Sequence, residues 1–307
     1  GRAVTRVRVV VPSWNVRDLL RECLTALAAS RGVVLETLVV DDASADGSAA
    51  MVAREFPDVR LVALTRNGGF AAACNEGLRG WTGPYALLLN ADTRVEPDAV
   101  AVLAAFLERN PRYAAAAPRL LHPDGRTQRA CMAFPRPATA LWHATPLERW
   151  FPASRELSRY FVRDFDHEGE RDVEQPPAAC LLLRRAALEE LGPVPFDERL
   201  VLYFNDVDLS LRLARAGWRT RFLPAARVVH HVGASTRQVP ERLLRWHLDR
   251  LGYFRKHHGR AAGLLLKATA VWSFTDFALR QWTGPLRGEA REPLGPVARS
   301  LGGLLLA

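Results

Sequence analysis

The chain has 307 residues, an apolar fraction of 49% and a formal charge of +9. This length suffices for one large α/β domain with an appendage or for two smaller domains, and the apolar fraction excludes wholesale disorder. The positive charge favours anionic partners such as nucleotide diphosphates, lipid headgroups or nucleic acid, without choosing among them. Four widely spaced cysteines with no Cys-x-x-Cys pair indicate reduced thiols in a cytosolic protein.

Strand and helix patterns alternate along the first 120 residues. Apolar runs typical of strands lie at 7–11, 35–40, 59–64 and 86–89, and apolar residues at helical spacing follow them. This alternation predicts an α/β fold built on a doubly wound, largely parallel sheet.

A polar residue stands where each of these strands ends, namely Ser13, Asp41, Arg66 and Asp92. Open α/β sheets bind ligands in the crevice outside the carboxyl ends of their strands, so the four strand ends predict one pocket. The glycine-containing loop that begins at Arg66 would place a guanidinium and backbone N–H groups against a diphosphate, although a plain turn explains its glycines equally well.

The strand-end carboxylates each have two interpretations. Asp92 closes the motif Asn90-Ala91-Asp92, where it is a candidate ligand for a divalent cation completed by substrate phosphates, or part of an ordinary turn. Asp41 is placed to accept a hydrogen bond from a pyrimidine N–H. For its neighbour Asp42, a structural role at the start of the next helix is as good an explanation as contact with the nucleoside.

The regular patterns fade between residues 118 and 177, where prolines and aromatic side chains are frequent. We interpret this segment as an elaborated region or lid over the acceptor side. Strand patterns return at 178–183, 219–223 and 227–229, with helices between them.

Asn205-Asp206-Val207-Asp208 opens one of these helices. Asp206 is a candidate general base for an acceptor hydroxyl, and the adjacent Tyr203 and Phe204 are suited to stacking on a sugar ring. The alternative is structural: Asn205 would cap the helix, with two acids favoured by the helix dipole in its first turn.

Two further features lie towards the carboxyl terminus. Adjacent side chains of an extended chain point to opposite faces, so at most one of His230 and His231 faces the crevice, and we favour His230 of the two. A purely structural role explains His230 equally well. Segment 242–260 is basic and amphipathic, which fits either a membrane surface or packing on the main domain. Segment 261–279 is the most membrane-like, but Lys267 and Asp276 interrupt it, so surface attachment is favoured over insertion.

In their order along the chain, these motifs resemble those of family 2 glycosyltransferases, most of all the bacterial rhamnosyltransferase-like branch. The resemblance extends from Val7 to Thr236. It rests on Pro12-Ser13-Trp14-Asn15, Val40-Asp41-Asp42-Ala43-Ser44-Ala45-Asp46-Gly47-Ser48, Arg66-Asn67-Gly68-Gly69-Phe70, Asn75-Glu76-Gly77, Leu89-Asn90-Ala91-Asp92, Phe196-Asp197-Glu198 and Tyr203-Phe204-Asn205-Asp206-Val207-Asp208-Leu209.

The resemblance implies a GT-A domain over residues 1–237, with a nucleotide-sugar half up to about 120 and an acceptor half beyond it, followed by an amphipathic helical region over 238–307. It implies an inverting transfer with Asp206 as base, and Mg²⁺ or Mn²⁺ held by Asp92 with His230. Tyr203, Phe204 and Asn205 would lie on the acceptor side. The donor would be bound by Pro12, Ser13, Asn15, Asp41, Arg66, Asn67, Gly69, Asn75, Asn90 and Ala91.

The resemblance also favours particular substrates: dTDP-rhamnose as donor, and a cell-envelope glycan or a polyprenyl-diphosphate-linked sugar as acceptor. We therefore expect no nucleic-acid partner, and a location in the cytoplasm or peripherally on the inner face of the cytoplasmic membrane. The oligomeric state is open. Two positions depart from the family pattern, because Asn90 and Asn205 stand where an acid is common.

Other function classes fit the sequence less well. A sugar-nucleotide-forming nucleotidyltransferase would show a glycine-rich loop with a lysine after the first strand, and this chain has no lysine before residue 256. A Rossmann oxidoreductase would show a glycine fingerprint that is missing here. A non-catalytic relative that binds a nucleotide sugar remains an alternative.

Overall fold

The computed structural model describes residues 4–233, 238, 241–283 and 294–307. In chain order the elements are β1 (Thr5–Ser13), α1 (Arg17–Ala28), β2 (Val33–Asp41), α2 (Ser48–Glu55), β3 (Arg60–Ala63), α3 (Phe70–Leu78), β4 (Tyr85–Leu89), β5 (Thr93–Val95), α4 (Ala99–Arg109), β6 (Tyr113–Leu121), α5 (Pro137–Trp142), α6 (Pro146–Trp150), α7 (Arg155–Tyr160), β7 (Arg171–Asp172), β8 (Cys180–Arg184), α8 (Arg185–Glu189), α9 (Asn205–Arg215), β9 (Arg219–His230), α10 (Arg242–Thr283) and α11 (Leu294–Leu306).

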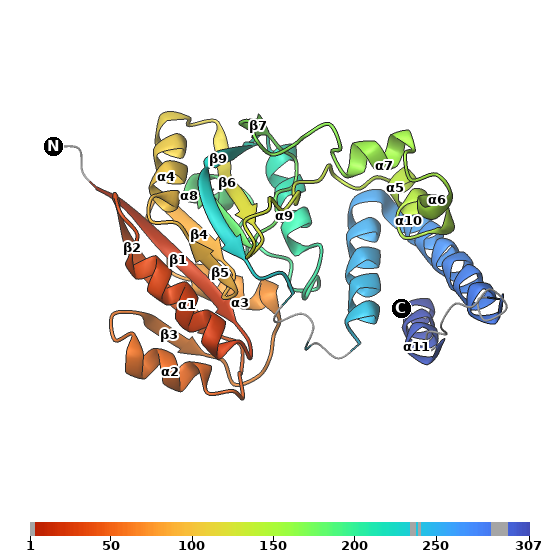
Figure 1. Ribbon diagram of the computed structural model, residues 1–307, viewed down its shortest axis with the longest axis horizontal. Coiled ribbons are helices and arrows are strands. Elements are labelled where there is room, and N and C mark those ends of the chain that lie inside the picture. Colours follow the sequence, from red (N-terminus) through yellow and green to blue (C-terminus); the bar gives the residue numbers. More distant parts are fainter. Residues whose placement is uncertain (1–3, 234–237, 239–240, 284–293) are drawn as a thin grey trace. The chain divides into compact units, whose positions relative to one another are not determined.

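The strands form one sheet in the order β3-β2-β1-β4-β8-β6-β9-β5, with β7 added alongside β9. The half made of β3, β2, β1 and β4 is parallel, whereas β8 runs antiparallel to both β4 and β6. Parallel strands joined by helices end at the same edge of a sheet, so the loops after β1, β2, β3 and β4 meet there. The α/β architecture that the alternating patterns predict is thereby confirmed (Figure 1).

Helices cover both faces of the sheet, and strand β1 shows why. Its alternate residues Val7, Val9 and Val11 pack into one core with α1, α2 and α4, whereas Val10 packs into a second core with α3, α8 and α9. A strand buried on both faces needs apolar residues at consecutive positions, which is the pattern that the sequence carries. Gly77 lets α3 approach β1 closely, because a Cβ there would lie 2.1 Å from Cγ1 of Val10.

The chain divides into two compact units. The first comprises Gly1–Met132, Phe165–Val201 and Asn205–Gln238, and the second comprises Ala133–Asp164, Leu202–Phe204 and Val239–Ala307. The predicted boundary at residue 237 lies next to the end of the first unit. However, most of the segment that we interpreted as a lid belongs to the second unit together with the carboxyl-terminal helices.

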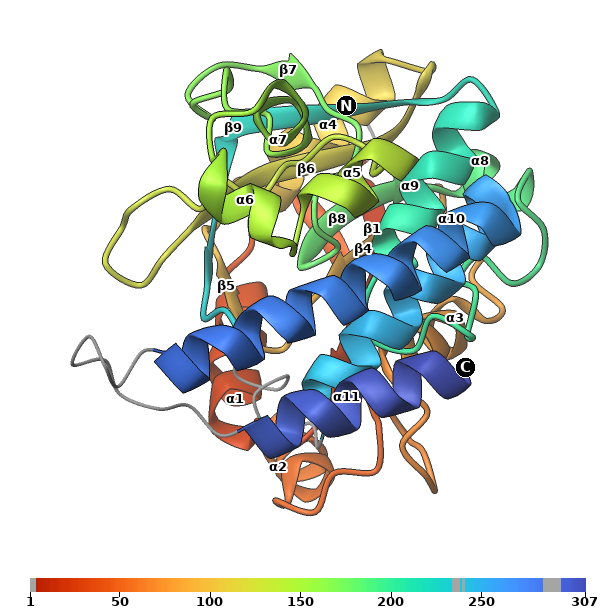
Figure 2. The same ribbon diagram turned by 90° about the vertical axis from the view of Figure 1, so that its right-hand side faces the viewer.

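The second unit is helical. Helix α10 packs against α5, α6 and α11, and Figure 2 shows α11 lying along α10. Gly259, with φ of 81°, interrupts α10 and divides it into two halves. In the first half Leu251 and Phe254 are buried, so the apolar face of the basic segment 242–260 packs within this unit. Among the described residues no helix combines the length and apolarity needed to cross a bilayer.

Two details of the fold differ from expectation. The strands expected at 219–223 and 227–229 are one strand, β9, because both parts pair with β6 across a register shift. The faded segment contains the three short helices α5, α6 and α7, each too short to give a clear helical period.

Candidate active site

Two buried polar atoms lie side by side at the end of β1 and β2. Ser13 and Asp41 are register partners in these strands, and each is 3% exposed. One carboxylate oxygen of Asp41 accepts the backbone N–H of Ser44 at 3.0 Å. Among the described residues Oγ of Ser13 and Oδ1 of Asp41 have no hydrogen-bond partner. Since buried polar atoms are normally paired, this corner is suited to a ligand that both donates and accepts hydrogen bonds.

The neighbouring carboxylate, that of Asp42, organises the glycine loop. It accepts the backbone N–H groups of Gly68 at 2.7 Å and of Gly69 at 2.9 Å. Burial raises the pKa of Asp42, while these two hydrogen bonds favour its charged form. These N–H groups, which we expected to face a diphosphate, therefore bind a protein carboxylate. Asp42 does not cap the next helix, since α2 begins at Ser48.

Gly69 is required by packing. Its φ is +84°, and a Cβ would lie 2.3 Å from Cγ1 of Val201, so no other residue fits without displacement. The adjacent Arg66 and Asn67 are exposed, so their side chains are accessible to a donor. Their contact with the donor stays a prediction.

Two predicted donor-binding asparagines hold loops together. The side chain of Asn15 accepts the N–H of Ala45 at 2.8 Å, which ties the loop after β1 to the loop after β2. The Asn75 amide pairs with both the N–H and the C=O of Phe196, at 3.0 and 2.9 Å, and donates to Glu198 at 2.9 Å. Pro12 lies in β1 just before Ser13.

Asp92 and His230 come together. Nε2 of His230 lies 3.5 Å from Oδ1 of Asp92, and both side chains are largely buried. The strands bring them together, because Thr93 of β5 is the register partner of His230 in β9. His231 instead donates its backbone N–H to the carbonyl of Asp92 at 2.9 Å. Asn90 and Ala91 form the turn that presents Asp92, with the Asn90 carbonyl accepting from the Thr93 hydroxyl at 2.7 Å.

Gln128 fixes the orientation of His230. Its Oε1 lies 3.1 Å from Nδ1 of His230, and its Nε2 donates to the His230 carbonyl at 2.7 Å. A partner on one ring nitrogen determines the tautomer and leaves the other nitrogen for a ligand. Nε2, the nitrogen nearest Asp92, is therefore the one available for metal binding.

The donor set fits a cation that takes part of its coordination from a substrate. One carboxylate and one imidazole suit Mn²⁺, and the carboxylate suits Mg²⁺, provided that phosphate oxygens or waters complete the shell. No cluster of three or more His, Cys, Asp or Glu side chains occurs in the part of the chain that the structure describes. In this part of the chain Asp92 and His230 are therefore the two candidate ligands at the strand end.

Asp206 lies beside the same strand end. Its Oδ2 accepts the N–H of Ala178 at 3.2 Å, and the carbonyl of the next residue, Ala179, accepts the N–H of Asn90 at 2.9 Å. The candidate base and the Asn90–Asp92 turn therefore flank the two-residue segment Ala178–Ala179, which directly precedes β8. Burial raises the pKa of Asp206, which makes its carboxylate a stronger base than an exposed one.

The residues that precede Asp206 belong partly to the second unit. Phe204 has φ of 60°, a backbone conformation that costs free energy in a bulky residue, and its ring packs near Trp246 and Tyr253. The backbone N–H groups of Leu202 and Tyr203 donate to the Asp249 carboxylate at 3.0 and 2.9 Å. Asn205 is buried, and its amide donates to the Leu200 carbonyl at 3.3 Å.

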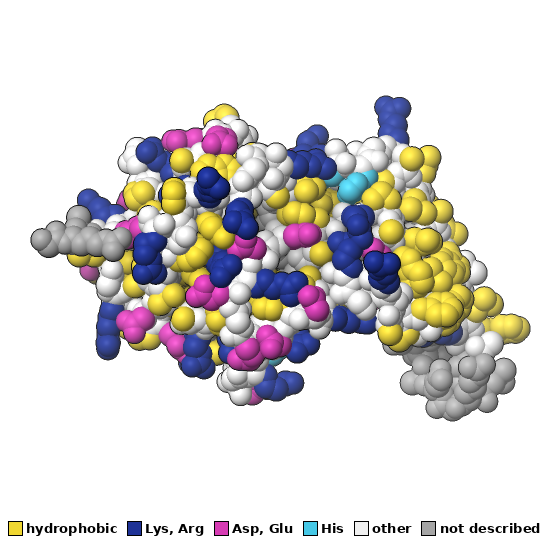
Figure 3. Space-filling model, turned by 90° about the horizontal axis from the view of Figure 1, so that it is seen from above, with side chains coloured by type: hydrophobic (Ala, Val, Ile, Leu, Met, Phe, Trp, Pro, Cys, Tyr) yellow, Lys and Arg dark blue, Asp and Glu magenta, His cyan; other side chains and the backbone are white. Residues whose placement is uncertain are grey.

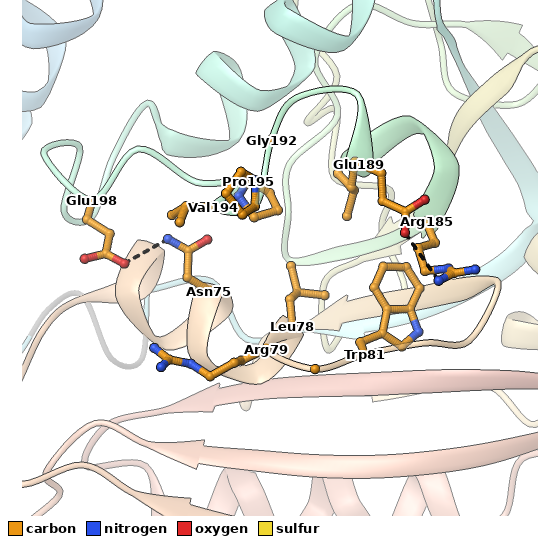
Figure 4. Close-up of a pocket in the computed structure, with 13 residues that line it drawn as sticks. Asn75, Leu78, Arg79, Trp81, Arg185, Glu189, Gly192, Val194, Pro195 and Glu198 are labelled. Carbon is orange, nitrogen blue, oxygen red and sulfur yellow. Dashed lines mark hydrogen bonds and ion pairs between the residues drawn. The ribbon is translucent and has the colours of Figure 1, made fainter.

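A cavity of about 450 Å³ lies elsewhere in the first unit (Figure 4). Leu78 and Trp81 line it ahead of β4, whereas Asp92 follows the opposite end of that strand. Its charged groups are paired with each other or with neighbours, for example Arg185 with Glu189 at 3.3 Å. Of the predicted donor-binding residues only Asn75 lines it, together with its partner Glu198. None of the strand-end residues Ser13, Asp41 and Asp92 does, so we place the candidate catalytic crevice at the strand ends.

Two residues of this arrangement, Gln128 and Asp249, have no signal in the sequence. Gln128 lies in the segment without regular patterns, and Asp249 lies in a helix outside the motifs. Asp42 stands in a strand-end motif, but its partners Gly68 and Gly69 lie 26 and 27 residues further along the chain. Such contacts depend on the tertiary structure.

Solved structures with the same fold define the class of protein. A mannosyltransferase from Pyrobaculum calidifontis, solved with GDP-Man and Mn²⁺, has a TM-score of 0.58 at 21% identity and covers all of this chain and 82% of its own. S. aureus TarS, solved as residues 1–349 with UDP, has a TM-score of 0.52 at 17% identity over 91% of this chain and 74% of its own. The fold is that of the GT-A glycosyltransferases.

The particular family follows from the sequence. The model of glycosyl transferase family 2 matches residues 8–192, more than half of the chain, so the protein belongs to this family and is a glycosyltransferase. An N-acetylglucosaminyl-diphospho-decaprenol L-rhamnosyltransferase of Mycobacterium tuberculosis is 28% identical over 297 residues, which span 93% of this chain and 89% of the relative. The Myxococcus xanthus O-antigen biosynthesis protein RfbC is 31% identical over 78% of this chain but 18% of its own length.

Proposed function

We propose that the enzyme transfers rhamnose from dTDP-rhamnose, with inversion, to a saccharide linked to a polyprenyl diphosphate. The observation that supports this best is that Asp206 and the Asn90–Asp92 turn flank Ala178 and Ala179, with His230 3.5 Å from Asp92. The near full-length similarity to a rhamnosyltransferase with a decaprenyl-diphosphate acceptor supports the choice of substrates.

The nucleoside would bind at the corner of β1 and β2. The free Oδ1 of Asp41 would accept an N–H of the pyrimidine, and the Ser13 hydroxyl would pair with a second polar atom of the nucleoside. Arg66, exposed on the adjacent loop, would offer its guanidinium to the diphosphate. A ligand that satisfies these buried atoms would recover the free energy that their burial costs.

Asp92 and His230 would hold Mg²⁺ or Mn²⁺, with Gln128 keeping the imidazole in place. A cation there would supply Lewis-acid stabilisation of the leaving diphosphate. Asp206 would accept the proton of the acceptor hydroxyl while the hydroxyl oxygen bonds to the anomeric carbon and the sugar–phosphate bond breaks. The nucleoside diphosphate leaves with the bonding electrons, and a single displacement inverts the anomeric centre.

The test is a donor panel with the purified full chain. We expect release of nucleoside diphosphate from dTDP-rhamnose in the presence of a water-soluble, short-chain prenyl-diphosphate acceptor and Mn²⁺ or Mg²⁺, and little release with EDTA. NMR of the product should show the anomeric configuration opposite to that of the donor. Faster turnover of another nucleotide sugar would reject the proposed donor, retained configuration would reject single displacement, and no turnover of any donor would favour the non-catalytic alternative.

A further inference from the structure

The second half of α10 carries an apolar stripe on its outward face. We define the apolar stripe as Ala261, Leu264, Ala268, Val271, Leu279 and Trp282, which recur at helical spacing and are all exposed. The largest members are Leu264, Leu279 and Trp282, exposed to 66%, 55% and 74%. A helix on the surface of a water-soluble unit normally presents polar residues outward. This one presents mostly apolar residues outward, with the exposed Thr275 between Val271 and Leu279.

The other face of the same half is also apolar and is already occupied. Ala262, Leu266 and Thr269 are buried within the second unit, where α10 packs against α5, α6 and α11. The stripe is therefore additional to the packing that holds the unit together. In Figure 3 hydrophobic side chains gather over the part of the molecule that the second unit forms, with basic side chains among them and at their edge.

Exposed aromatic residues accompany the stripe. Trp150 and Phe151 are more than half exposed, and Trp150 packs edge-on against Trp272 of α10 with ring centroids 5.9 Å apart. Arg149 binds Asp276 of α10 through two contacts of 2.9 Å, which fixes α6 to this helix. Tryptophan is the residue that prefers the boundary between a bilayer and water.

The charge of the second unit identifies the partner. This unit contains 16 Lys and Arg against 8 Asp and Glu, a formal charge of +8, whereas the whole chain carries +9. Anionic lipid headgroups attract such a surface, and apolar side chains then enter the boundary between headgroups and acyl chains. A neutral protein partner would gain nothing from this concentration of positive charge.

We propose that the apolar stripe is the face by which the second unit binds an anionic lipid bilayer. It deepens the proposed function, since a polyprenyl-linked acceptor is embedded in such a bilayer. The binding itself does not depend on turnover. The helix would lie in the plane of the membrane surface, with the leucines and Trp282 inserted and the basic side chains at the headgroups.

Vesicle co-sedimentation of the full chain tests the proposal. We expect wild type to sediment with phosphatidylcholine vesicles that contain phosphatidylglycerol, and less with phosphatidylcholine alone or at high salt. Replacing two stripe leucines, Leu264→Ser with Leu279→Ser, should weaken partitioning by about 10-fold or more for each leucine. Val194→Ser is the matched control, since Val194 is 55% exposed in the first unit, and it should bind as wild type does.

Each contrary outcome is informative. Unchanged partitioning of the double variant, or equal binding of wild type to neutral and anionic vesicles, would overturn the proposal. So would a wild-type dimer in light scattering that the double variant converts to monomer, because a second copy would then cover the stripe. Turnover with the water-soluble acceptor separates this proposal from the proposed function. The double variant should turn over this acceptor as wild type does. If wild type bound vesicles but showed no turnover, the proposed function would be rejected and the membrane proposal would stand.

Discussion

The two units differ in where their charge and their apolar surface lie. The first unit has 26 basic against 25 acidic residues, and several of its carboxylates, including Asp41, Asp42 and Asp92, are buried at strand ends. The second unit carries a formal charge of +8 and exposes the apolar stripe. Buried carboxylates at a sheet edge suit chemistry on a charged donor, whereas a basic and apolar surface suits binding to a membrane.

This difference suggests a division of labour between chemistry and location. Substitutions at the candidate site of the first unit should change turnover wherever it is measured, whereas substitutions in the stripe should matter only when a bilayer is present. The units are not independent, because residues 202–204 belong to the second unit and lead directly into the helix that begins with Asn205 and Asp206.

The largest expected effect is that of Asp206→Asn. Removing the base should lower kcat by about 10²- to 10⁴-fold and leave the donor KM nearly unchanged, because the base acts in the chemical step. Steady-state kinetics with the water-soluble acceptor provide the measurement, and Glu189→Gln, which removes an ion pair at the cavity, is the control. Wild-type turnover in Asp206→Asn would leave Asp206 with a structural role.

The pH dependence of Asp206 gives a second measurement on the same residue. Burial raises its pKa above the ordinary aspartate value of 3.8. In the proposed mechanism the active form is the carboxylate, so kcat should fall on acidification at a higher pH than an ordinary aspartate would give. Because the folded state disfavours the charged form, the residue lowers stability above its folded pKa, and Asp206→Asn should unfold at no lower temperature than wild type at pH 7.

An intermediate effect is expected for Gln128→Ala. Loss of the partner on Nδ1 frees the His230 ring, and substitutions of this kind weaken metal binding by about 10- to 100-fold. The change is measured by titrating Mn²⁺ while recording enzyme activity and, separately, the fraction of Mn²⁺ that is bound. Asp92→Ala should weaken metal-dependent donor binding more than Gln128→Ala does. Gln175→Ala removes another buried glutamine of the first unit and should leave metal affinity unchanged.

A smaller effect is expected for Asp249→Ala, which tests the connection between the units. The Asp249 carboxylate fixes the N–H groups of Leu202 and Tyr203, three and two residues before Asn205 opens the helix. We expect kcat to fall several-fold with the donor KM unchanged, and partial rescue in Asp249→Asn, which keeps an acceptor oxygen. Asp276→Ala removes a carboxylate paired with Arg149 and Arg280 in the same unit, and equal loss in this control would contradict a positioning role.

The smallest effect concerns acid stability of the second unit. Burial, with a contribution from Arg250, lowers the pKa of His247 to about 4. The unfolded histidine has a pKa of about 6.5, so the folded state binds fewer protons and its stability falls as the pH drops from 6.5 towards 4. His247→Gln should flatten the pH dependence of the thermal unfolding midpoint across this window. If the unfolding midpoint of His247→Gln changed with pH as steeply as that of wild type, the lowered pKa of His247 would be contradicted.

The strand-end positions could be predicted from the sequence because they depend on local order. Apolar runs at short intervals specify parallel strands, and the polar residues that end them must then share one edge, as Ser13 and Asp41 do. The roles of the glycines could not be predicted in the same way. Gly69 is required by Val201, which lies 132 positions later in the chain.

The sequence by itself determined the α/β class, the family and the candidate residues for the chemistry, because each depends on local periodicity or on the order of short motifs. Only the tertiary structure decided which groups meet: Gln128 with His230, Asp42 with Gly68 and Gly69, and Asp249 with the backbone before Asp206. It also decided which apolar residues stay exposed. Leu251 and Leu264 look alike in the sequence of α10, and packing of neighbouring helices buries the first and leaves the second in solvent.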